Sequence, residues 1–259
     1  MAKNSFEIDL IKEFPHLPNA PIVEAVIHWR ARAAKSLNPE SFFGALREKL
    51  PNYPNARPQQ EIEMEMQAGP DGSRHTQQTH WHGFRFQAAN ERHIAQFTKN
   101  GFVFSRLKPY GNWEEFETEA TRLWSIHKEL ANPSEVQRLG VRFINAIDAV
   151  QSRQLGKTLT LPPKSPPKMN LTVRGFTHQT RFEVPGHPYN LNVIQTIQPA
   201  SAPDAKGETL IIDIDVFTTE LLPCDDEILS KRLQEMRFLK DNAFFTLLKG
   251  PILKRFEGE

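Results

Sequence analysis

The order of structural elements is clearest from the stretch Pro21-Ile22-Val23-Glu24-Ala25-Val26-Ile27-His28-Trp29-Arg30. Its odd positions, Val23 to Trp29, are apolar and alternate with Glu24, Val26, His28 and Arg30, and this period of two is typical of a half-buried strand. Asn38-Pro39 follows and predicts the start of a helix, because asparagine caps helices and proline is tolerated in the first turn. The chain therefore opens with a strand and then a helix, which ends at Pro51.

Four more strands and a second helix complete the first half of the chain. A hairpin turn is predicted at Lys99-Asn100-Gly101, because Asn-Gly tolerates the positive φ of a tight turn. Asn112 is a helix cap with Glu115 three residues later, a capping-box pattern, and the helix runs to about Leu130. The stretch Gly69 to Gln78 has the composition of a polar loop. The predicted strands lie around 61–66, 83–86, 93–97 and 102–107.

The second half repeats this order without its first helix. A strand is predicted over 137–149, and a proline-rich stretch, 157–168, predicts an exposed, partly polyproline connection. The final helix is predicted from about Asp225 to Leu248 and is closed by Gly250-Pro251. Further strand-like segments are 170–174, 175–182, 190–198 and 209–217, with a surface loop over 201–207.

These elements predict an α+β protein made of two similar halves without sequence repeats. The halves are residues 1–133 (strand, helix, four strands, helix) and 134–259 (strand, loop, strands, helix), packed as one continuous unit. Consecutive strands joined by short turns favour antiparallel pairing. We therefore expect an antiparallel curved sheet with long helices on one face, of the helix-grip or TATA-binding-protein-like kind.

Composition excludes several classes of protein. The chain has 259 residues and carries 32 Lys+Arg against 31 Asp+Glu, a formal net charge of +1, which gives no global argument for nucleic acid or membrane. Its apolar runs are far shorter than the ~20 residues that span a bilayer, and its N-terminus lacks the apolar region of a secretory signal. A lone Cys224 excludes a disulfide framework and favours a reducing compartment, so we expect a cytoplasmic protein.

Several segments together resemble one family. They are residues 19–25 (Asn-Ala-Pro-Ile-Val-Glu-Ala), 101–107 with Trp113 and Glu114, 142–145 (Arg-Phe-Ile-Asn) and 213–217 (Asp-Ile-Asp-Val-Phe). In this order they resemble a sporadically distributed, uncharacterised prokaryotic family of about this length. The resemblance spans nearly the whole chain and implies a place in mobile or defence-related gene clusters. It supplies no catalytic residues to carry over.

The densest group of histidines is His75, His80 and His82. Imidazoles two residues apart on a strand share a face, so His80 and His82 could hold a metal with Glu63 or Glu65 of a neighbouring strand. The alternative interpretation is a polar strand end leaving a loop, since the spacing fixes no third ligand.

A second candidate is a polar face of the sheet. Asp213 and Asp215 share one face of their strand, Arg138 and Arg142 share one face of another, and Glu24, His28 and Arg30 do so on the first. One interpretation is cross-strand ion pairs on a solvated face. The other is a binding surface for an anionic ligand, anchored by Arg138 and Arg142, because guanidinium groups bind phosphate in a bidentate way.

Other signals are weaker. Cys224 at the start of the last helix is interpreted as a structural cysteine, since two acids follow it. The basic residues of the C-terminal region are interleaved with acids, which favours a solvated helix face over a nucleic-acid stripe. The sequence has no phosphate-binding glycine loop, no Gly-x-Ser-x-Gly elbow and no His-Glu-x-x-His motif.

The leading hypothesis is therefore a non-catalytic binding protein with no cofactor and no catalytic residues assigned. Its partner would be a protein or a small anionic ligand, held by the open polar face of the sheet or by loops, through Arg138, Arg142, Asp213, Asp215, Glu24 and His28. Two alternatives stay open. One is a metal-dependent phosphodiesterase or nuclease built on His80 and His82. The other is a nucleic-acid-binding module, which the charge balance does not favour, and no membrane partner is expected.

Overall fold

A computed structural model describes residues 5–69, 72–151, 154–164, 166, 168–169, 171, 173–199 and 207–258, with the side chains of 65–69, 72–75 and 149 left aside. The strands are β1 (Ile22–Arg30), β2 (Asn55–Gly69), β3 (Gly72–Gln87), β4 (His93–Thr98), β5 (Gly101–Leu107), β6 (Glu135–Val136), β7 (Arg138–Val150), β8 (Thr177–Glu183), β9 (Asn190–Pro199), β10 (Glu208–Thr218) and β11 (Leu222–Pro223). The helices are α1 (Pro39–Lys49), α2 (Trp113–Ala131), α3 (Leu155–Thr158), α4 (Asp226–Leu247), α5 (Gly250–Leu253) and the short 3₁₀ turn η2 (Lys254–Phe256).

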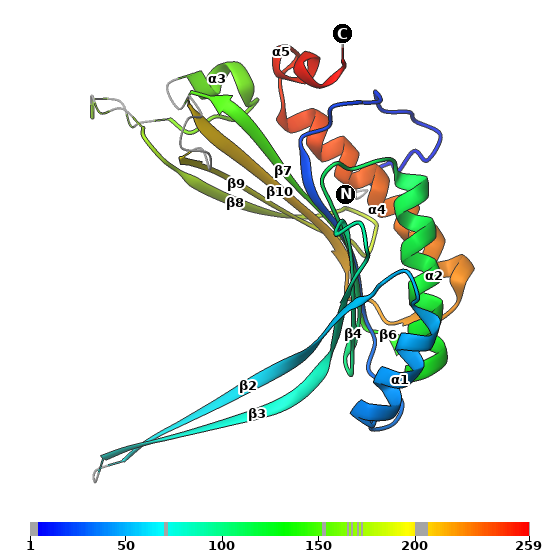
Figure 1. The fold of residues 1–259 in the computed structure, drawn as a ribbon. Helices are drawn as coiled ribbons and strands as arrows, with labels where there is room; N and C mark the ends of the chain where they lie inside the picture. The colour runs from blue at the N-terminus through cyan, green and yellow to red at the C-terminus, as the bar shows by residue number, and fades with distance from the viewer. Residues whose placement is uncertain are drawn as a thin grey trace.

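Nine strands form one antiparallel sheet in the order β2-β3-β4-β5-β1-β7-β10-β9-β8. In Figure 1, α1, α2 and α4 lie on one face of this sheet, and no helix of the described residues covers the opposite face. The protein is thus an α+β protein, as the element order predicts, and its sheet is not strongly curled. No helix in the described part of the chain is long and apolar enough to cross a membrane.

The first and second halves of the chain meet where β1 pairs with β7. The alternation of β1 is confirmed: Ala25, Ile27 and Trp29 are buried towards the helices, while Glu24 and His28 lie on the open face and are only partly buried. Trp29 stacks on Trp124 of α2 with ring centroids 5.4 Å apart. One continuous apolar core therefore runs under the sheet from both halves.

Helix ends follow the capping residues of the sequence. The Asn38 side chain accepts a hydrogen bond from Ser41 N at 3.0 Å, and Asn112 accepts one from Glu115 N at 2.8 Å. Asp225 caps α4 by accepting from Ile228 N at 2.9 Å. These bonds satisfy amide groups that have no partner inside the first helical turn, which explains why the predicted starts of all three helices are confirmed.

Three local predictions are wrong or incomplete. The described residues of Gly69 to Gln78 do not form a loop: β2 runs to Gly69 and β3 starts at Gly72, because a long hairpin pairs these polar residues with each other. The final helix does end before Gly250-Pro251, at Leu247, and a short helix, α5, begins at Gly250 with proline in its first turn.

No strand forms over the described residues of 170–174 (Leu171, Val173 and Arg174), where Leu171 is 68 % exposed. The proline-rich stretch begins inside the four-residue helix α3, and its other described residues have almost no regular structure. Residues 201–206 of the predicted surface loop lie outside the described residues.

Candidate functional site

The predicted Arg–Asp face exists, and its charges are paired. Arg138 donates to both oxygens of Asp215 at 2.9 and 3.1 Å, and Arg142 donates through Nε to Asp213 at 2.8 Å and through a second nitrogen to its other oxygen. Both pairs join β7 to β10, and Arg142–Asp213 has the two-nitrogen bidentate geometry that is strongest for arginine and carboxylate, whereas Arg138 uses one nitrogen for both oxygens. Both guanidinium groups therefore already have a carboxylate partner, and Arg142, whose side chain is 48 % exposed, keeps one nitrogen outside its pair.

His28 extends this cluster, whereas Glu24 only adjoins it. His28 Nδ1 lies 3.3 Å from Arg138, whose guanidinium group also sits 4.6 Å from the centre of the Phe217 ring. Burial, followed by the nearby charges of Arg138 and Arg30, lowers the pKa of His28 to about 4. Burial also raises the pKa of Asp215, against the opposing effect of Arg138. Glu24 acts on Arg142 through its charge, as a minor cause of the raised pKa of that arginine.

The predicted histidine pair lies on the β2–β3 hairpin. His80 Nε2 is 3.8 Å from Glu63 Oε2, and His82 Nδ1 is 3.4 Å from Glu61 Oε2. Each imidazole thus has its own carboxylate, and Lys99 also contacts Glu61 at 3.1 Å. Within the described residues no group of three or more His, Cys, Asp or Glu side chains is placed to hold a metal ion. The side chains of Glu65 and His75 lie outside the described ones.

Cys224 is partly buried just before α4, where its Sγ lies 3.5 Å from the carbonyl oxygen of Pro133. Burial raises the pKa of this thiol, which opposes formation of the reactive thiolate.

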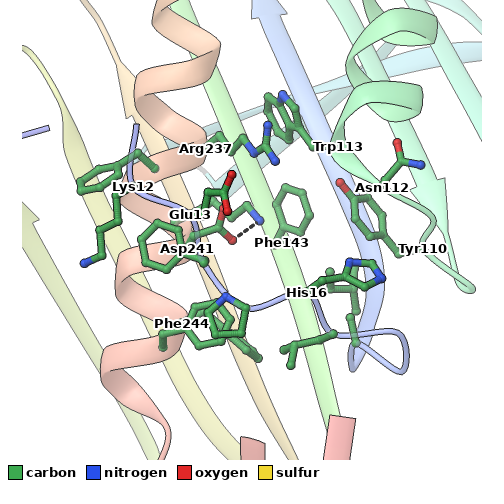
Figure 2. Close-up of a pocket in the computed structure, with 18 of the residues that line it drawn as sticks. Lys12, Glu13, His16, Tyr110, Asn112, Trp113, Phe143, Arg237, Asp241 and Phe244 are labelled. Carbon is green, nitrogen blue, oxygen red and sulfur yellow. Dashed lines mark hydrogen bonds and ion pairs between the residues drawn. The ribbon is translucent and has the colours of Figure 1, made fainter. Parts of the chain in front are cut away.

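A cavity of about 660 Å³ lies on the helix-covered side of the sheet, and no sequence motif pointed to it. Its floor is formed by β7 and β10, one side by the start of α2, the other by α4, and the N-terminal segment crosses it (Figure 2). Seven aromatic side chains line it: Phe14, Tyr110, Trp113, Phe143, Phe238, Phe244 and Phe245. Ligand pockets have volumes of roughly 300–1,000 Å³, so this cavity has the size of one, and its exposed lining is about equally polar and apolar.

The N-terminal segment, residues 5–20, contains no helix or strand and is held largely by its aromatic rings. Phe14 stacks on Phe245 of α4 with centroids 5.5 Å apart, and Phe6 lies 6.4 Å from Phe238. Backbone bonds at each end fix its course, from Phe6 N to Pro185 O and from Asn19 N to Phe256 O. The segment therefore closes one side of the cavity through side-chain packing.

Lys240 is the most unusual residue of this cavity. Its side chain is only 11 % exposed, its Nζ lies 4.1 Å from the centre of the Phe143 ring, and it donates to Asp241 Oδ1 at 2.6 Å. An ammonium group has three donors, and among the described residues only Asp241 accepts from this one. Its other donors can still pair with a ligand, so this wall of the cavity is suited to a ligand that supplies acceptors.

Tyr110 adds a second such donor. Its ring packs edge-on against Phe143 with centroids 5.4 Å apart, and its hydroxyl is buried with no hydrogen-bond partner in the described part of the structure. Burial, and then the charge of Asp241, raises the pKa of the hydroxyl well above its ordinary value, so it stays protonated. Tyr110 and Lys240 therefore both bring a polar group to the Phe143 ring.

Arg237 and Glu117 near the cavity have partners, whereas Lys12, Asp9 and Glu13 of the lining have no ion pair among the described residues. Arg237 lies 5.6 Å from the Trp113 ring centre and donates to Glu114 at 3.0 Å. Behind them Glu117 accepts from Trp113 Nε1 at 2.7 Å, and burial raises its pKa despite this and other hydrogen bonds.

Helical spacing was the signal that could have revealed Lys240. The buried stripe of α4 includes Leu229, Leu233, Met236, Lys240 and Phe244, so this lysine occupies an apolar position three to four residues from its neighbours. Counting it among the solvated basic residues of the C-terminal region was therefore wrong. Tyr110 gave no such signal, because it lies in a connection between β5 and α2.

Comparisons with protein-family models, curated proteins and solved structures find no match for this chain, so the site is interpreted from its own residues alone.

Proposed function

We propose that this chain is a non-catalytic binding protein that holds a small molecule in the cavity between α4, the sheet and the N-terminal segment. The observation that carries the proposal is the cavity of about 660 Å³ with its aromatic walls and its buried donors on Lys240 and Tyr110. Apolar walls with a few fixed polar groups are typical of ligand sites. The proposed binding role is the one that the sequence suggests. The proposed site, however, lies on the helix-covered face of the sheet instead of the open polar face.

The chemistry of the lining favours binding over turnover. The residues that surround the cavity include no serine, threonine or cysteine, and the only described hydroxyl there belongs to Tyr110. Nucleophilic catalysis needs an activated hydroxyl, thiol, amine or carboxylate beside a base. Of the two amines of the lining, Lys240 is in an ion pair with Asp241 and Lys12 lies over the Phe14 ring. The lining also holds His16 and four carboxylates, and none of these carboxylates has an ion pair with His16.

The strand order supports the proposed two-half architecture. β1 and β7 lie together at the centre of the sheet, β5 and β10 flank them, and β2 and β8 form the outer edges. α2 and α4 each follow the last long strand of a half. We propose that the two halves are structurally similar, in the manner of helix-grip or TATA-binding-protein-like folds, which hold ligands or partners against one sheet.

A cavity-filling substitution tests the binding proposal. Ala20 lines the cavity, so Ala20→Trp would place an indole ring in its space. We expect the wild-type protein to gain thermal stability with at least one compound of a metabolite library, since binding to the native state raises the midpoint of unfolding. Native mass spectrometry of the same samples would detect the bound mass.

Ala34→Trp is the matched control, because Ala34 is exposed and does not line the cavity. We expect Ala34→Trp to keep the binding and Ala20→Trp to lose it. Binding that survives in Ala20→Trp, or a library with no stabilising compound, would contradict the proposal.

A further inference from the structure

The polar groups of the cavity define the edge of its ligand. Lys240 Nζ and the Tyr110 hydroxyl offer donors, while Asp241, 2.6 Å from Lys240, offers acceptor oxygens beside them. A ligand that satisfies all three needs acceptor and donor atoms next to each other. Amide-like edges of nitrogen heterocycles have this pattern, and carboxylates, which only accept, do not.

The aromatic walls of the cavity indicate the shape of the ligand. Phe143 and Trp113 face each other with planes 25° apart and centroids 6.4 Å apart, and Phe14 and Phe245 form a second, nearly parallel pair at 12°. Aromatic rings interact best with other flat rings, in stacked or edge-on contacts. Phe143 and Trp113 are almost fully buried, so the accessible rings are those of Phe14, Tyr110 and Phe245, and these favour a planar ligand over a flexible aliphatic one.

The charged side chains of the cavity limit the net charge of the ligand. The lining has four carboxylates (Asp9, Glu13, Glu114 and Asp241) against the cations Lys12, Arg237 and Lys240. Lys240 and Arg237 are each paired with a carboxylate, at 2.6 and 3.0 Å. A phosphate group of charge near −2 would meet four carboxylates, and Lys12 is the one lysine or arginine of the described lining that has no ion pair to lose.

We propose that the cavity binds an uncharged, flat nitrogen heterocycle whose edge places a hydrogen-bond acceptor beside a donor, as nucleobases do. This inference rests on the proposed function and specifies the class of its ligand. The acceptor of the heterocycle takes the hydrogen bonds of Tyr110 and Lys240, its donor is bound by Asp241, and its ring lies against the partly exposed aromatic rings of the wall.

Calorimetric titration of the full chain with six probes tests this assignment. The probes are adenine, guanine, cytosine and uracil, with benzoate as a flat acid and benzene as a flat ring without a polar edge. We expect at least one base to bind more tightly than benzoate and benzene. We also expect its 5′-monophosphate nucleotide to bind more weakly than the base.

Two variants separate hydrogen bonding from packing. Tyr110→Phe and Asp241→Asn should each weaken binding of the preferred base about 10-fold, the effect of one lost hydrogen bond in a buried site. Tyr110→Phe should leave the thermal midpoint of the free protein unchanged or higher, since its hydroxyl has no partner to lose. The control Asp226→Asn changes an exposed acid at the other end of α4 and should leave binding unchanged.

The outcomes distinguish the two proposals. Tighter binding of benzoate or benzene in the wild type, lost in Ala20→Trp, would overturn the heterocycle assignment and support the binding function. No binding by any base would also overturn the assignment, and the metabolite library would then decide the function. Affinities unchanged in both Tyr110→Phe and Asp241→Asn would overturn the assignment as well.

Discussion

His127 links burial to pH dependence. It is fully buried beside Trp124 and Phe102, and burial lowers its pKa to about 4, against a small opposing effect of the Ala31 backbone. Below pH 6.5 the unfolded chain binds a proton at this histidine that the folded chain does not, so stability falls as pH drops towards 4. His28 has the same direction of shift and adds to the loss.

We predict that the free energy of unfolding falls by about 1–2 kcal/mol less in His127→Phe than in the wild type between pH 7 and pH 5, as measured by urea denaturation. His178 is exposed, and His178→Gln serves as the control that should leave the slope unchanged. An equal pH slope for wild type and His127→Phe would contradict the prediction.

Gly101 is required at the β4–β5 turn. Its φ is +146°, and a Cβ there would lie 2.1 Å from the carbonyl oxygen of Trp29 and 2.9 Å from Ala31 N. Backbone atoms of the central strand cannot move aside without breaking the sheet. We predict that Gly101→Ala lowers the free energy of unfolding by about 2 kcal/mol or more. Gly44→Ala, where no atom lies within 4 Å, should show no loss in the same chemical denaturation assay.

The start of α4 depends on one capping side chain. Asp225 accepts from Ile228 N at 2.9 Å, while Glu227, in the same turn, is exposed and makes no hydrogen bond to a described residue. Both variants remove a negative charge from the helix start, but only Asp225→Ala also removes the capping hydrogen bond. Asp225→Ala should therefore cost about 1 kcal/mol of stability and Glu227→Ala only a few tenths. Thermal unfolding of the two variants measures the difference, and equal shifts would argue against the capping role.

The continuous core joins both halves of the chain. Phe104 of the first half and Ile214 of the second are both fully buried in the same apolar cluster, and β1 pairs with β7 along almost its whole length. We expect one cooperative unfolding transition. Phe104→Ala should lower the free energy of unfolding by about 3–5 kcal/mol and Ile214→Ala by about 2–5 kcal/mol, and both should lower the midpoint of this one transition. Two separate transitions in calorimetry, each moved by only one of the variants, would contradict this shared core.

Local signals predicted the elements well. Alternation placed β1 and β7, because a strand half-buried in a sheet must show its period in the residues themselves. Asn38, Asn112 and Asp225 located three helix starts, because capping is a contact within a few residues. The hairpin β2–β3 was predicted only in part, since its pairs join polar residues whose composition is that of a loop.

The sequence by itself therefore determined the α+β class, the order of the elements and the faces of the central strands. Only the tertiary structure decided which charges neutralise each other, since Arg138 and Asp215 are 77 positions apart in the chain and meet across β7 and β10. It alone also formed the cavity, because Phe14, Tyr110, Phe143 and Lys240 come from four separate segments. Local periodicity records which side chains are buried, and only packing determines what they are buried against.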